Sequence, residues 1–568
     1  MARNSSLPPA LASPVTQPGA GVPHPHRPHS ISPLRDFVEQ IAIAFILAFL
    51  VRGFGAEAFV IPTGSMAPTL MGMHKDVDCP RCGAQFMVNA SEEFDHRGNQ
   101  RELATVVSGI CANCRLPVKL ADRPTFNGDR ILVNKFLYNL PWVSKDQPKR
   151  WEVVVFHYPE EPETNYIKRL VGMPNEQLKI IHGDILRKPL GTDDDFRLLR
   201  KPMPHLQAML QTVYDDRYRP KLLEAKPAWH RWSASEPSSW SEVESQTSAY
   251  TSKPTDSWST LRYQHLIPDP SQSRALIAGQ PADPQPRLIS DYYSYNSGSP
   301  YEQQMADPIS PHWVGDLSIR FQAKSTEKSG ALRVTLVEAG VFYHCEIDLQ
   351  TGQARLFRDD EQLGDPAPTA FKNGGTHDIQ FANVDGRLTL WIDGDTPFGE
   401  GMLVQDGQEG YGAPTAEDLQ PVRIASRAAS VTVSDLVLCR DIYYTLTPGD
   451  WDYTGLGIFR GTTLSDPTEF GRISELRPAE YTIHSESYMM LGDNSPRSKD
   501  GRGWSLRDRD WDDGDRQAWE VPEELLIGKA FYVYWPHGKP FWPNLPLGGS
   551  RNFRIPFRPN FERMKWIR

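Results

Sequence analysis

Short runs in which apolar and polar residues alternate predict that much of this chain is β-structure. Three runs rich in β-branched and aromatic residues, at 151–156, 177–181 and 530–535, predict one strand each. No long amphipathic helix is predicted next to these runs. The parts of the chain that carry them are therefore expected to be mainly β.

The middle of the chain, from about 190 to 447, shows this alternation more regularly. Apolar residues occupy every second position in runs that start at Leu317, Leu332, Leu388 and Val431. Turn signals such as Asp385-Gly386 separate some of the runs. Short strands at this spacing predict a β-sandwich over about 312–445, inserted into another domain. The stretch 377–394 also resembles the concanavalin-like or laminin-G-like jelly rolls.

A continuous apolar pattern lies near the N-terminus. Residues 1–34 are rich in Pro, Ser and His and predict a disordered tail. The stretch that follows predicts a transmembrane helix over 35–57, provided that Arg52 reaches the membrane surface with its long side chain. A buried or interfacial helix is the alternative. Arg27, Arg35 and the absence of acidic residues in the tail favour an N-terminus inside the cell and the rest of the chain outside.

Composition narrows the function classes only a little. The chain of 568 residues has a formal net charge of −10, which argues against a nucleic-acid partner because nucleic-acid-binding proteins are basic. Its content of 23% charged and 39% hydrophobic residues is ordinary for globular domains. The chemistry must therefore be sought in local motifs.

Four of the six cysteines form two Cys-x-x-Cys pairs, Cys79 with Cys82 and Cys111 with Cys114. Two such pairs predict a small zinc-ribbon-like insertion over 76–120, because each pair offers two thiolates to a tetrahedral site. A zinc ion held by four protein ligands is expected to be structural, and no cofactor is predicted for catalysis. Disulfides are the alternative, since an extracytoplasmic location oxidises thiols.

A serine and a lysine stand in sequence surroundings that suit nucleophilic catalysis. Ser65 follows Gly64, and the preceding Pro62 keeps the backbone extended, so the hydroxyl is expected at a surface. A serine hydroxyl becomes a good nucleophile when a neighbouring base accepts its proton. Lys168 lies in an alternating run that can direct it into a dry cavity, where burial would lower its pKa and leave it neutral.

These two residues belong to a set of motifs that occur in one order along the chain. The matching stretches are 61–66, 68–70, 128–136, 153–156, 158–160, 166–169, 171–172 and 492–494. Together they resemble signal peptidase I, the leader peptidase that removes secretory signal sequences. The resemblance implies a mainly β catalytic domain divided by the insertions into the segments 58–75, 121–189 and 448–568.

The resemblance also implies roles for individual residues. Ser65 takes the place of the nucleophile and Lys168 that of the base. The N–H group of Ser65 and the hydroxyl of Thr63 correspond to the oxyanion hole. Supporting positions fall on Ser498, which would contact the lysine ammonium, and on Asp500 and Arg502, which would form a structural ion pair.

The substrates that the resemblance implies are exported preproteins with small residues, such as Ala-x-Ala, before the cleavage site. The location it implies is the plasma (inner) membrane, with a single span and an extracytoplasmic catalytic domain. Membrane lipid is then a partner. The inserted sandwich is expected to have a ligand of its own, whose identity the sequence does not give.

Two departures from the family pattern follow the Gly492-Asp-Asn motif. Ser495-Pro-Arg replaces the usual polar run, and an acidic, arginine-rich insertion occupies 505–520. This insertion leaves open whether Trp504 or Trp519 takes the family's aromatic position. Neither departure involves Ser65 or Lys168.

Other functions compete with the peptidase hypothesis. One is a membrane-tethered glycan- or protein-binding scaffold with an inactive peptidase domain, in which Trp391 could be a sugar platform rather than a core residue. Another keeps the Ser/Lys chemistry for self-cleavage, as in repressor proteases, but the apolar segment and the lack of a DNA-binding element argue against it.

Overall fold

The computed structural model describes most of the chain. The described residues are 33–50, 55–95, 99–135, 138, 147–234, 238–244, 246, 248–301, 310–372, 374–407, 412–449, 452, 463–504, 517–540 and 557–568. The predicted tail lies outside this set except for its last two residues, and so does most of the predicted insertion at 505–520.

The N-terminal unit contains one helix, α1 (Pro33–Leu50). Its large apolar side chains are exposed, at Leu34, Phe37, Val38, Ile41, Ile43, Phe45, Ile46, Leu47 and Phe49. Within the described part of the chain, the structure has no helix whose length and hydropathy would suffice to cross a membrane.

The transmembrane helix predicted over 35–57 is therefore not found in the described part of the chain. Its last two residues, Ala56 and Glu57, already belong to strand β1 (Ala56–Val60). This strand pairs with β6 (Arg130–Asn134), in a register that sets Ala56 opposite Asn134. Pairing with a neighbouring strand, which lies far away in the sequence, overrides the local helical pattern here.

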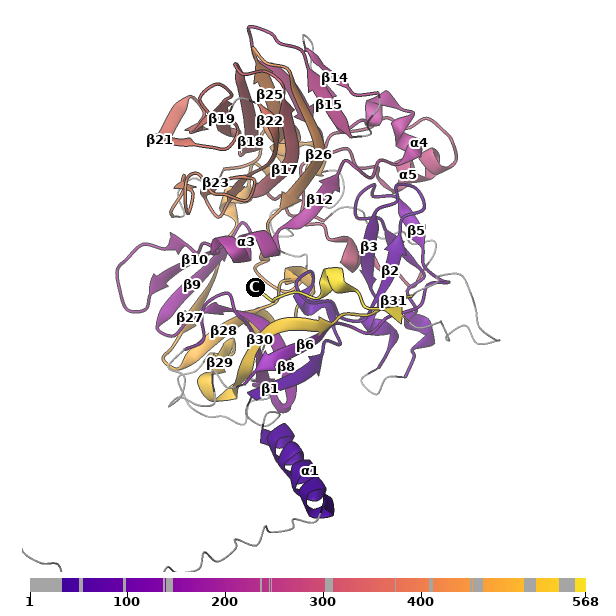
Figure 1. Ribbon diagram of the computed structural model, residues 1–568, viewed down its shortest axis with the longest axis vertical. Helices are drawn as coiled ribbons and strands as arrows, with labels where there is room; N and C mark the ends of the chain where they lie inside the picture. The colour runs from indigo at the N-terminus through magenta and orange to yellow at the C-terminus, as the bar shows by residue number, and fades with distance from the viewer. Residues whose placement is uncertain are drawn as a thin grey trace, which may run out of the picture. The chain divides into compact units, whose positions relative to one another are not determined.

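Seven antiparallel strands form the first sheet of the second unit, in the order β1-β6-β30-β7-β8-β28-β29 (Figure 1). The remaining members are β7 (Val153–Tyr158), β8 (Glu161–Gly172), β28 (Ser487–Leu491), β29 (Glu520–Pro522) and β30 (Leu526–Trp535). The strands predicted at 151–156 and 530–535 are confirmed. The sheet joins residues from both ends of the chain, with the long middle region between them.

A smaller sheet has the order β11-β10-β9-β27. Its strands are β9 (Glu176–Ile181), β10 (Asp184–Pro189), β11 (Arg197–Leu198) and β27 (Ala479–Ile483). The strand predicted at 177–181 is confirmed as most of β9. Apolar side chains of this sheet pack in one cluster with Val171, Met489 and Leu491 of the first sheet.

Two hairpins carry the cysteine pairs. Strand β2 (His74–Asp78) pairs with β3 (Gln85–Asn89), and β4 (Ser108–Ile110) pairs with β5 (Pro117–Lys119). Cys79 and Cys82 lie in the turn of the first hairpin, and Cys111 and Cys114 in the turn of the second. Apolar residues of both hairpins form one buried cluster.

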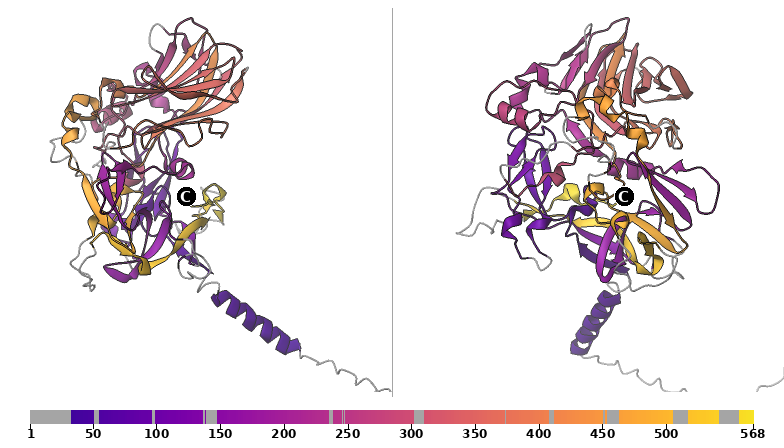
Figure 2. Two further views of the ribbon diagram at one scale, coloured as in Figure 1. Left: turned by 90° about the vertical axis from the view of Figure 1, so that its left-hand side faces the viewer. Right: turned by 180° about the vertical axis from the view of Figure 1, so that it is seen from behind.

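The middle region folds into a β-sandwich of two antiparallel sheets (Figures 1 and 2). One sheet has the order β14-β15-β26-β17-β22-β23-β24, with β12 also paired to β26, and the other has the order β13-β16-β25-β18-β19-β20-β21. The strands of the predicted part are β17 (Leu317–Ser325), β18 (Ala331–Glu338), β19 (Val341–Asp348), β20 (Gln353–Arg358), β21 (Glu361–Pro368), β22 (Gly375–Val384), β23 (Arg387–Ile392), β24 (Met402–Leu403), β25 (Val422–Arg427) and β26 (Val431–Arg440).

The sandwich is larger than predicted. Five earlier strands join its two sheets, namely β12 (Gln211–Asp215), β13 (Trp232–Ala234), β14 (Trp240–Glu242), β15 (Ala249–Ser252) and β16 (Ser259–Tyr263). These strands are short and come from a Ser-, Trp- and Pro-rich stretch without clear alternation. Three of them, β12, β15 and β16, pair with β25 or β26, more than 150 residues later in the chain, and β13 and β14 pair with β16 and β15, so local pattern did not reveal them.

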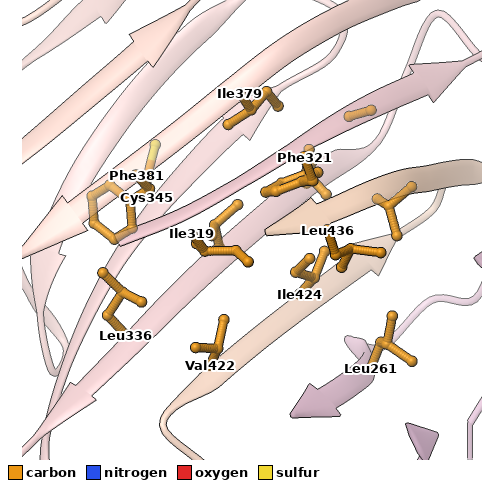
Figure 3. Close-up of a cluster of buried hydrophobic side chains, with 14 of the residues drawn as sticks. Leu261, Ile319, Phe321, Leu336, Cys345, Ile379, Phe381, Val422, Ile424 and Leu436 are labelled. Atoms are coloured by element: carbon orange, nitrogen blue, oxygen red, sulfur yellow. The ribbon is translucent and has the colours of Figure 1, made fainter. Parts of the chain in front are cut away.

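The space between the two sheets is filled by the apolar residues of the alternating runs. Figure 3 shows Ile319, Phe321 and Phe381 of one sheet facing Leu336 and Ile424 of the other. All of these side chains are buried. Trp391 is also buried, in a separate cluster with Leu206, Ala382 and Val384, so it is a packing residue and not an exposed platform.

Short helices connect the strands. The α-helices are α3 (Met203–Met209), α4 (Lys221–Glu224) and α5 (Pro270–Ile277). The 3-10 helices are η2 (Gly64–Met66), η3 (Ser91–Glu93), η4 (Glu102–Ala104), η5 (Pro227–Trp229), η6 (Ser294–Ser297), η7 (Ala416–Leu419), η9 (Thr463–Ser465), η10 (Pro467–Phe470), η11 (Ile473–Glu475), η12 (Ser495–Arg497), η13 (Gly501–Gly503), η15 (Glu523–Leu525) and η16 (Phe561–Arg563). A last strand pair joins β31 (Lys539–Pro540) to β32 (Phe557–Arg558).

Candidate active site

Ser65 lies in the short helix η2, directly after β1 has ended and the chain has turned at Pro62. Only 9% of its surface is exposed. Gly64 before it is required by close packing, because a Cβ atom there would lie 2.3 Å from Cε1 of Tyr295. The small residue lets the loop, which we call the nucleophile loop (residues 62–67), lie flat against the aromatic ring.

Lys168 reaches Ser65 from strand β8, which holds it opposite Val154 of β7. Its Nζ atom lies 2.8 Å from Oγ of Ser65 and 3.1 Å from the carbonyl oxygen of Ile167. The lysine is 4% exposed, so the two side chains meet in a nearly dry environment. The sequence separates them by 103 positions, and the antiparallel sheet brings them together.

Burial lowers the pKa of Lys168 to about 8, because a charged ammonium loses its hydration there. The carboxylates of Asp500 and Asp493 oppose this shift, and the guanidinium of Arg502 adds to it. When the amine is charged, it donates to Oγ of Ser65. When it is neutral, its lone pair can accept the serine proton, which is what a general base requires.

Thr63 is exposed, at the entrance to the nucleophile loop. Its backbone is extended, and its hydroxyl makes no capping bond to η2. The hydroxyl is therefore not engaged in holding the helix. It stands two residues before Ser65, at the position that the resemblance to signal peptidases assigns to the oxyanion hole.

Ser498 is buried close to the dyad but does not contact it. Its Oγ atom has no hydrogen-bond partner, although only 1% of the residue is exposed. Ser498 packs over Gly492, where a Cβ atom would lie 2.1 Å from Oγ of Ser498 and 2.6 Å from the carbonyl oxygen of Ser65. Ser498 thus makes no hydrogen bond to Lys168, whose amine bonds to Ser65 and Ile167.

Asp500 and Arg502 form an ion pair with no solvent exposure of either side chain, at 2.7 Å between Nη2 and Oδ2. The carboxylate also accepts the N–H group of Gly492. Arg502 donates further to Oγ of Ser495 and to the carbonyl oxygen of Thr445. The pair thus ties the loop after β28 to the chain that leaves the sandwich.

A second buried ion pair was not assigned by sequence reasoning. Arg169 donates two hydrogen bonds to Asp493, at 2.7 and 2.6 Å, and neither side chain is exposed. Thr69 completes the group through its hydroxyl, which bonds to both partners. Arg169 directly follows Lys168, and Asp493 lies in the Gly492-Asp-Asn motif, but neither charged residue was given a role from the sequence.

Asn494 is another functional position that the sequence did not single out. Its side-chain amide donates to the carbonyl oxygen of Gly64 at 3.0 Å, and its backbone N–H donates to the carbonyl oxygen of Ser65 at 3.1 Å. Two bonds from one residue therefore fix the nucleophile loop against the turn after β28.

Trp504, rather than Trp519, lies beside the lysine strand. Its ring is 5.5 Å from that of Tyr158, which in turn stacks on Tyr166 at 4.2 Å. Trp519 packs instead on Tyr481 in the smaller sheet. The aromatic group around Trp504 covers the stretch of β8 that precedes Lys168.

The four predicted cysteine ligands converge on one point. The Sγ atoms of Cys79 and Cys114 are 3.8 Å apart and those of Cys82 and Cys111 are 3.5 Å apart, and all four lie within 4.8 Å of one another. None of the four forms a disulfide, whose sulfur atoms would be about 2 Å apart. A tetrahedral zinc ion with Zn–S bonds of about 2.3 Å separates its sulfur ligands by roughly 3.8 Å, so the group fits such an ion.

Two other groups of metal-ligating side chains occur among the described residues. In the first, His74 bonds to the carbonyl oxygen of Gly72 and to His537, which bonds to Asp76. Burial lowers the pKa of His74 to about 4, so this histidine is neutral and its ring atoms are already hydrogen-bonded. The second group consists of Asp184, Asp316 and Asp385. Neither group offers four ligands, as the cysteine group does.

The comparisons with known proteins address the part of the chain that contains Lys168. Residues 103–189 match the family model described as "Signal peptidase, peptidase S26". Over this stretch the chain is similar to signal peptidases. We therefore call the first sheet and the loops that bear Ser65 and Asn494 the peptidase part.

Named relatives agree with this match over limited lengths. The signal peptidase I of Pseudomonas fluorescens is 46% identical over 65 residues, which is 10% of this chain and 23% of the relative. That of Leptolyngbya laminosa is 25% identical over 181 residues, or 31% of this chain and 60% of the relative. The chain thus covers about a quarter of the first of these relatives and about three fifths of the second.

The solved structures that resemble the chain do so weakly. A Bacillus subtilis protein of unknown function with a galectin-like fold covers 41% of this chain and 100% of its own, at 9% identity and a TM-score of 0.23. The carbohydrate binding module CBM66 from Bacillus subtilis covers 36% of this chain and 93% of its own, at 8% identity and a TM-score of 0.22. Scores this low support no argument about the sandwich.

Proposed function

We propose that the chain is a signal peptidase I, a serine endopeptidase that cleaves N-terminal signal peptides from exported preproteins. The observation that carries this proposal is the distance of 2.8 Å between Nζ of Lys168 and Oγ of Ser65, in a nearly dry site. The match of residues 103–189 to the peptidase S26 family supports it from the sequence.

The reaction follows from the geometry of the dyad. Neutral Lys168 accepts the proton of Ser65 as its Oγ attacks the carbonyl carbon of the scissile peptide bond. The oxyanion that forms receives hydrogen bonds from the N–H group of Ser65 and from the hydroxyl of Thr63. The lysine then gives its proton to the leaving amine. Water, deprotonated by the same amine, hydrolyses the acyl-enzyme.

The remaining site residues act by holding these groups. Asn494 fixes the carbonyl oxygens of Gly64 and Ser65, which sets the direction of the serine side chain. Arg169 with Asp493, and Arg502 with Asp500, fasten the strands and loops on both sides. Ser498 lies above Gly492, where rotation of its hydroxyl toward the amine would let it support the charged form of Lys168.

The test is a cleavage assay with a model preprotein that has Ala-x-Ala before the cleavage site. We expect the full chain to release the signal peptide and the Ser65→Ala variant to release none, while both give the same melting curve. Undiminished cleavage by Ser65→Ala would remove the proposal. A wild-type chain that binds the preproteins without cleaving them would indicate an inactive scaffold.

The cysteine group is proposed to hold one structural zinc ion through Cys79, Cys82, Cys111 and Cys114. The sulfur separations of 3.5 and 3.8 Å support this assignment. Elemental analysis of the purified chain is expected to find about one zinc per chain, and the Cys82→Ser with Cys111→Ser double variant is expected to lose it. A chain with four titratable thiols and no metal would contradict the assignment.

Attachment to membrane lipid is proposed to involve α1. Nine of its large apolar side chains are exposed, among them Phe45 at 61% and Phe49 at 67%. Such side chains are stabilised when they leave water for acyl chains. We expect the full chain to sediment with phospholipid vesicles and the Phe45→Glu with Phe49→Glu double variant to stay in solution. Equal binding of both proteins would exclude α1 as the attachment site.

A further inference from the structure

A segment of the middle region connects the cysteine hairpins to the nucleophile loop. It comprises residues 292–299, with η6 at its centre, and we call it the strap. The strap lies outside the motifs that resemble signal peptidases. It precedes β17 and takes no part in either sheet of the sandwich.

Both ends of the strap are held by the second cysteine hairpin. At one end, the ring of Tyr292 stacks against the guanidinium of Arg115, at 3.8 Å, and Arg115 directly follows Cys114. At the other end, Ser299 exchanges backbone hydrogen bonds with Ser108 of β4, at 3.0 and 3.2 Å. The strap is thus attached on either side of the turn that carries two of the cysteines.

The centre of the strap is attached as well. The N–H group of Ile110, the residue before Cys111, donates to Oγ of Ser297 at 2.9 Å. Gly298 packs so closely that a Cβ atom would lie 2.9 Å from the carbonyl oxygen of Asn89 in β3. Strands of both cysteine hairpins therefore contact the strap, and its position depends on how the two hairpins are held together.

On its opposite side the strap contacts the nucleophile loop. The side-chain amides of Asn296 and Asn494 form two reciprocal hydrogen bonds, at 2.7 and 2.8 Å. Asn494 uses the same amide nitrogen to hold the carbonyl oxygen of Gly64. Tyr295, 1% exposed, packs against Gly64. Two neighbouring residues of the strap thus support the backbone from which Ser65 projects.

We propose that the four-cysteine site is a positioning site for the peptidase reaction. Zn²⁺ bound by the cysteines joins the two hairpins, the hairpins hold the strap, and Asn296 of the strap holds Asn494 and through it the nucleophile loop. Asn296 is a positioning residue, since it touches neither Ser65 nor Lys168. The inference rests on the proposed function, in which Ser65 is the nucleophile.

Small displacements of a nucleophile cost a large part of the rate, because the attack needs short distances and aligned orbitals. The apolar cluster of the hairpins is small, with twelve buried residues, and a metal ion commonly supplies what such a small core lacks. Loss of the ion is therefore expected to loosen the hairpins first and the strap with them. Strands β7 and β8, of which β8 carries Lys168, have their buried apolar residues in other clusters and should stay folded.

The first test compares full-length Asn296→Ala with wild type in the preprotein cleavage assay. We expect kcat to fall about tenfold or more, with KM within about twofold and the pH midpoint near 8 unchanged, because the surroundings of Lys168 remain. The matched control is Asn99→Ala, an exposed asparagine of the cysteine insertion whose amide bonds to Asp95. We expect Asn99→Ala to keep the wild-type kcat, and full activity of Asn296→Ala would overturn the proposal.

The second test removes zinc from wild type and from Asn296→Ala with a chelator. Wild type is expected to lose about tenfold in kcat and to recover it when Zn²⁺ is returned, whereas Asn296→Ala should change by less than about twofold. Equal losses in both proteins would contradict a path through Asn296. Unchanged activity of metal-free wild type would exclude a role for the metal.

Hydrogen exchange separates this inference from the proposed function. Amides of the nucleophile loop are expected to exchange faster after zinc removal or in Asn296→Ala, while those of β7 and β8 keep their protection. This result would hold even if the chain cleaved no preprotein, in which case the proposed function alone would fail. Unchanged exchange of the loop would refute the positioning role.

Discussion

The interior of the sandwich and the interior of the peptidase part differ in the polarity of their buried side chains. Between the sandwich sheets, the cluster around Ile319, Phe321 and Phe381 consists of apolar side chains. Around the dyad, the side chains of Arg169, Asp493, Asp500 and Arg502 are all fully buried although they are charged. The sandwich interior serves stability, whereas the peptidase interior keeps polar groups in fixed positions.

The difference teaches how the lysine can be a base. The buried carboxylates near Lys168 are paired with arginines: Asp493 with Arg169 and Asp500 with Arg502. The amine of Lys168 therefore has no carboxylate at hydrogen-bond distance. Desolvation then outweighs the attraction of Asp493 and Asp500 and lowers the pKa of Lys168. A purely apolar interior would offer no means of orienting the dyad. A direct Lys–Asp pair would keep the amine charged.

The largest effect is expected from the dyad itself. Lys168→Met keeps a long unbranched side chain but removes the base, so cleavage of the model preprotein should fall by a factor of about 10³ or more. Single-turnover kinetics measure this decrease in the cleavage rate. If Lys168→Met kept more than about a tenth of the wild-type cleavage rate, Lys168 would not be the base, and the buried polar groups around it would not serve to orient one.

A loss of stability is expected from breaking a buried ion pair. Asp493→Ala leaves Arg169 buried without its carboxylate partner, and we expect the free energy of unfolding to fall by about 3–5 kcal/mol. Denaturant titration of the full chain, with cleavage activity as the signal for the peptidase part, measures this change in the free energy of unfolding. Unfolding of the sandwich, followed by a tryptophan signal, should be unaffected. Equal destabilisation of both parts would argue for one cooperative unit.

The pH profile tests the desolvated amine. Because the pKa of Lys168 is lowered to about 8, its neutral fraction rises about tenfold per pH unit below that value and levels off above it. Between pH 6 and pH 8 we expect kcat to rise by about 50-fold. Initial rates over pH 5–10 measure the profile. A flat profile would exclude Lys168 as the base.

The smallest effect is expected in the sandwich. Ile319→Val removes one methylene from a fully buried side chain, which should cost about 0.5–1.5 kcal/mol of the sandwich's stability. The kcat for the preprotein should remain that of wild type, because the cluster has no contact with the dyad. Thermal unfolding and the cleavage assay measure the two quantities. A decrease in kcat would show that sandwich packing reaches the active site.

Much of the architecture was predictable because a half-buried strand shows an alternation of apolar and polar residues in its own sequence. The alternation at Leu317, Leu332 and Leu388 predicted strands of the sandwich that are present in the structure. The strands of 211–263 were missed, since they are short and three of them depend on partners more than 150 residues away. The end of the predicted membrane helix was misplaced for the same reason, as Ala56 pairs with Asn134.

The sequence by itself determined which reactive groups this protein has. They stand in local patterns: a serine after glycine, a lysine in an alternating strand, and two cysteine pairs. Only the tertiary structure decided which groups meet. It brought Lys168 to Ser65, left Ser498 without a partner, joined Arg169 to Asp493, and set Asn296 against Asn494. Hydrogen bonds and desolvation act over a few ångströms in space, whereas the residues they join here lie 103 to 324 positions apart in the chain.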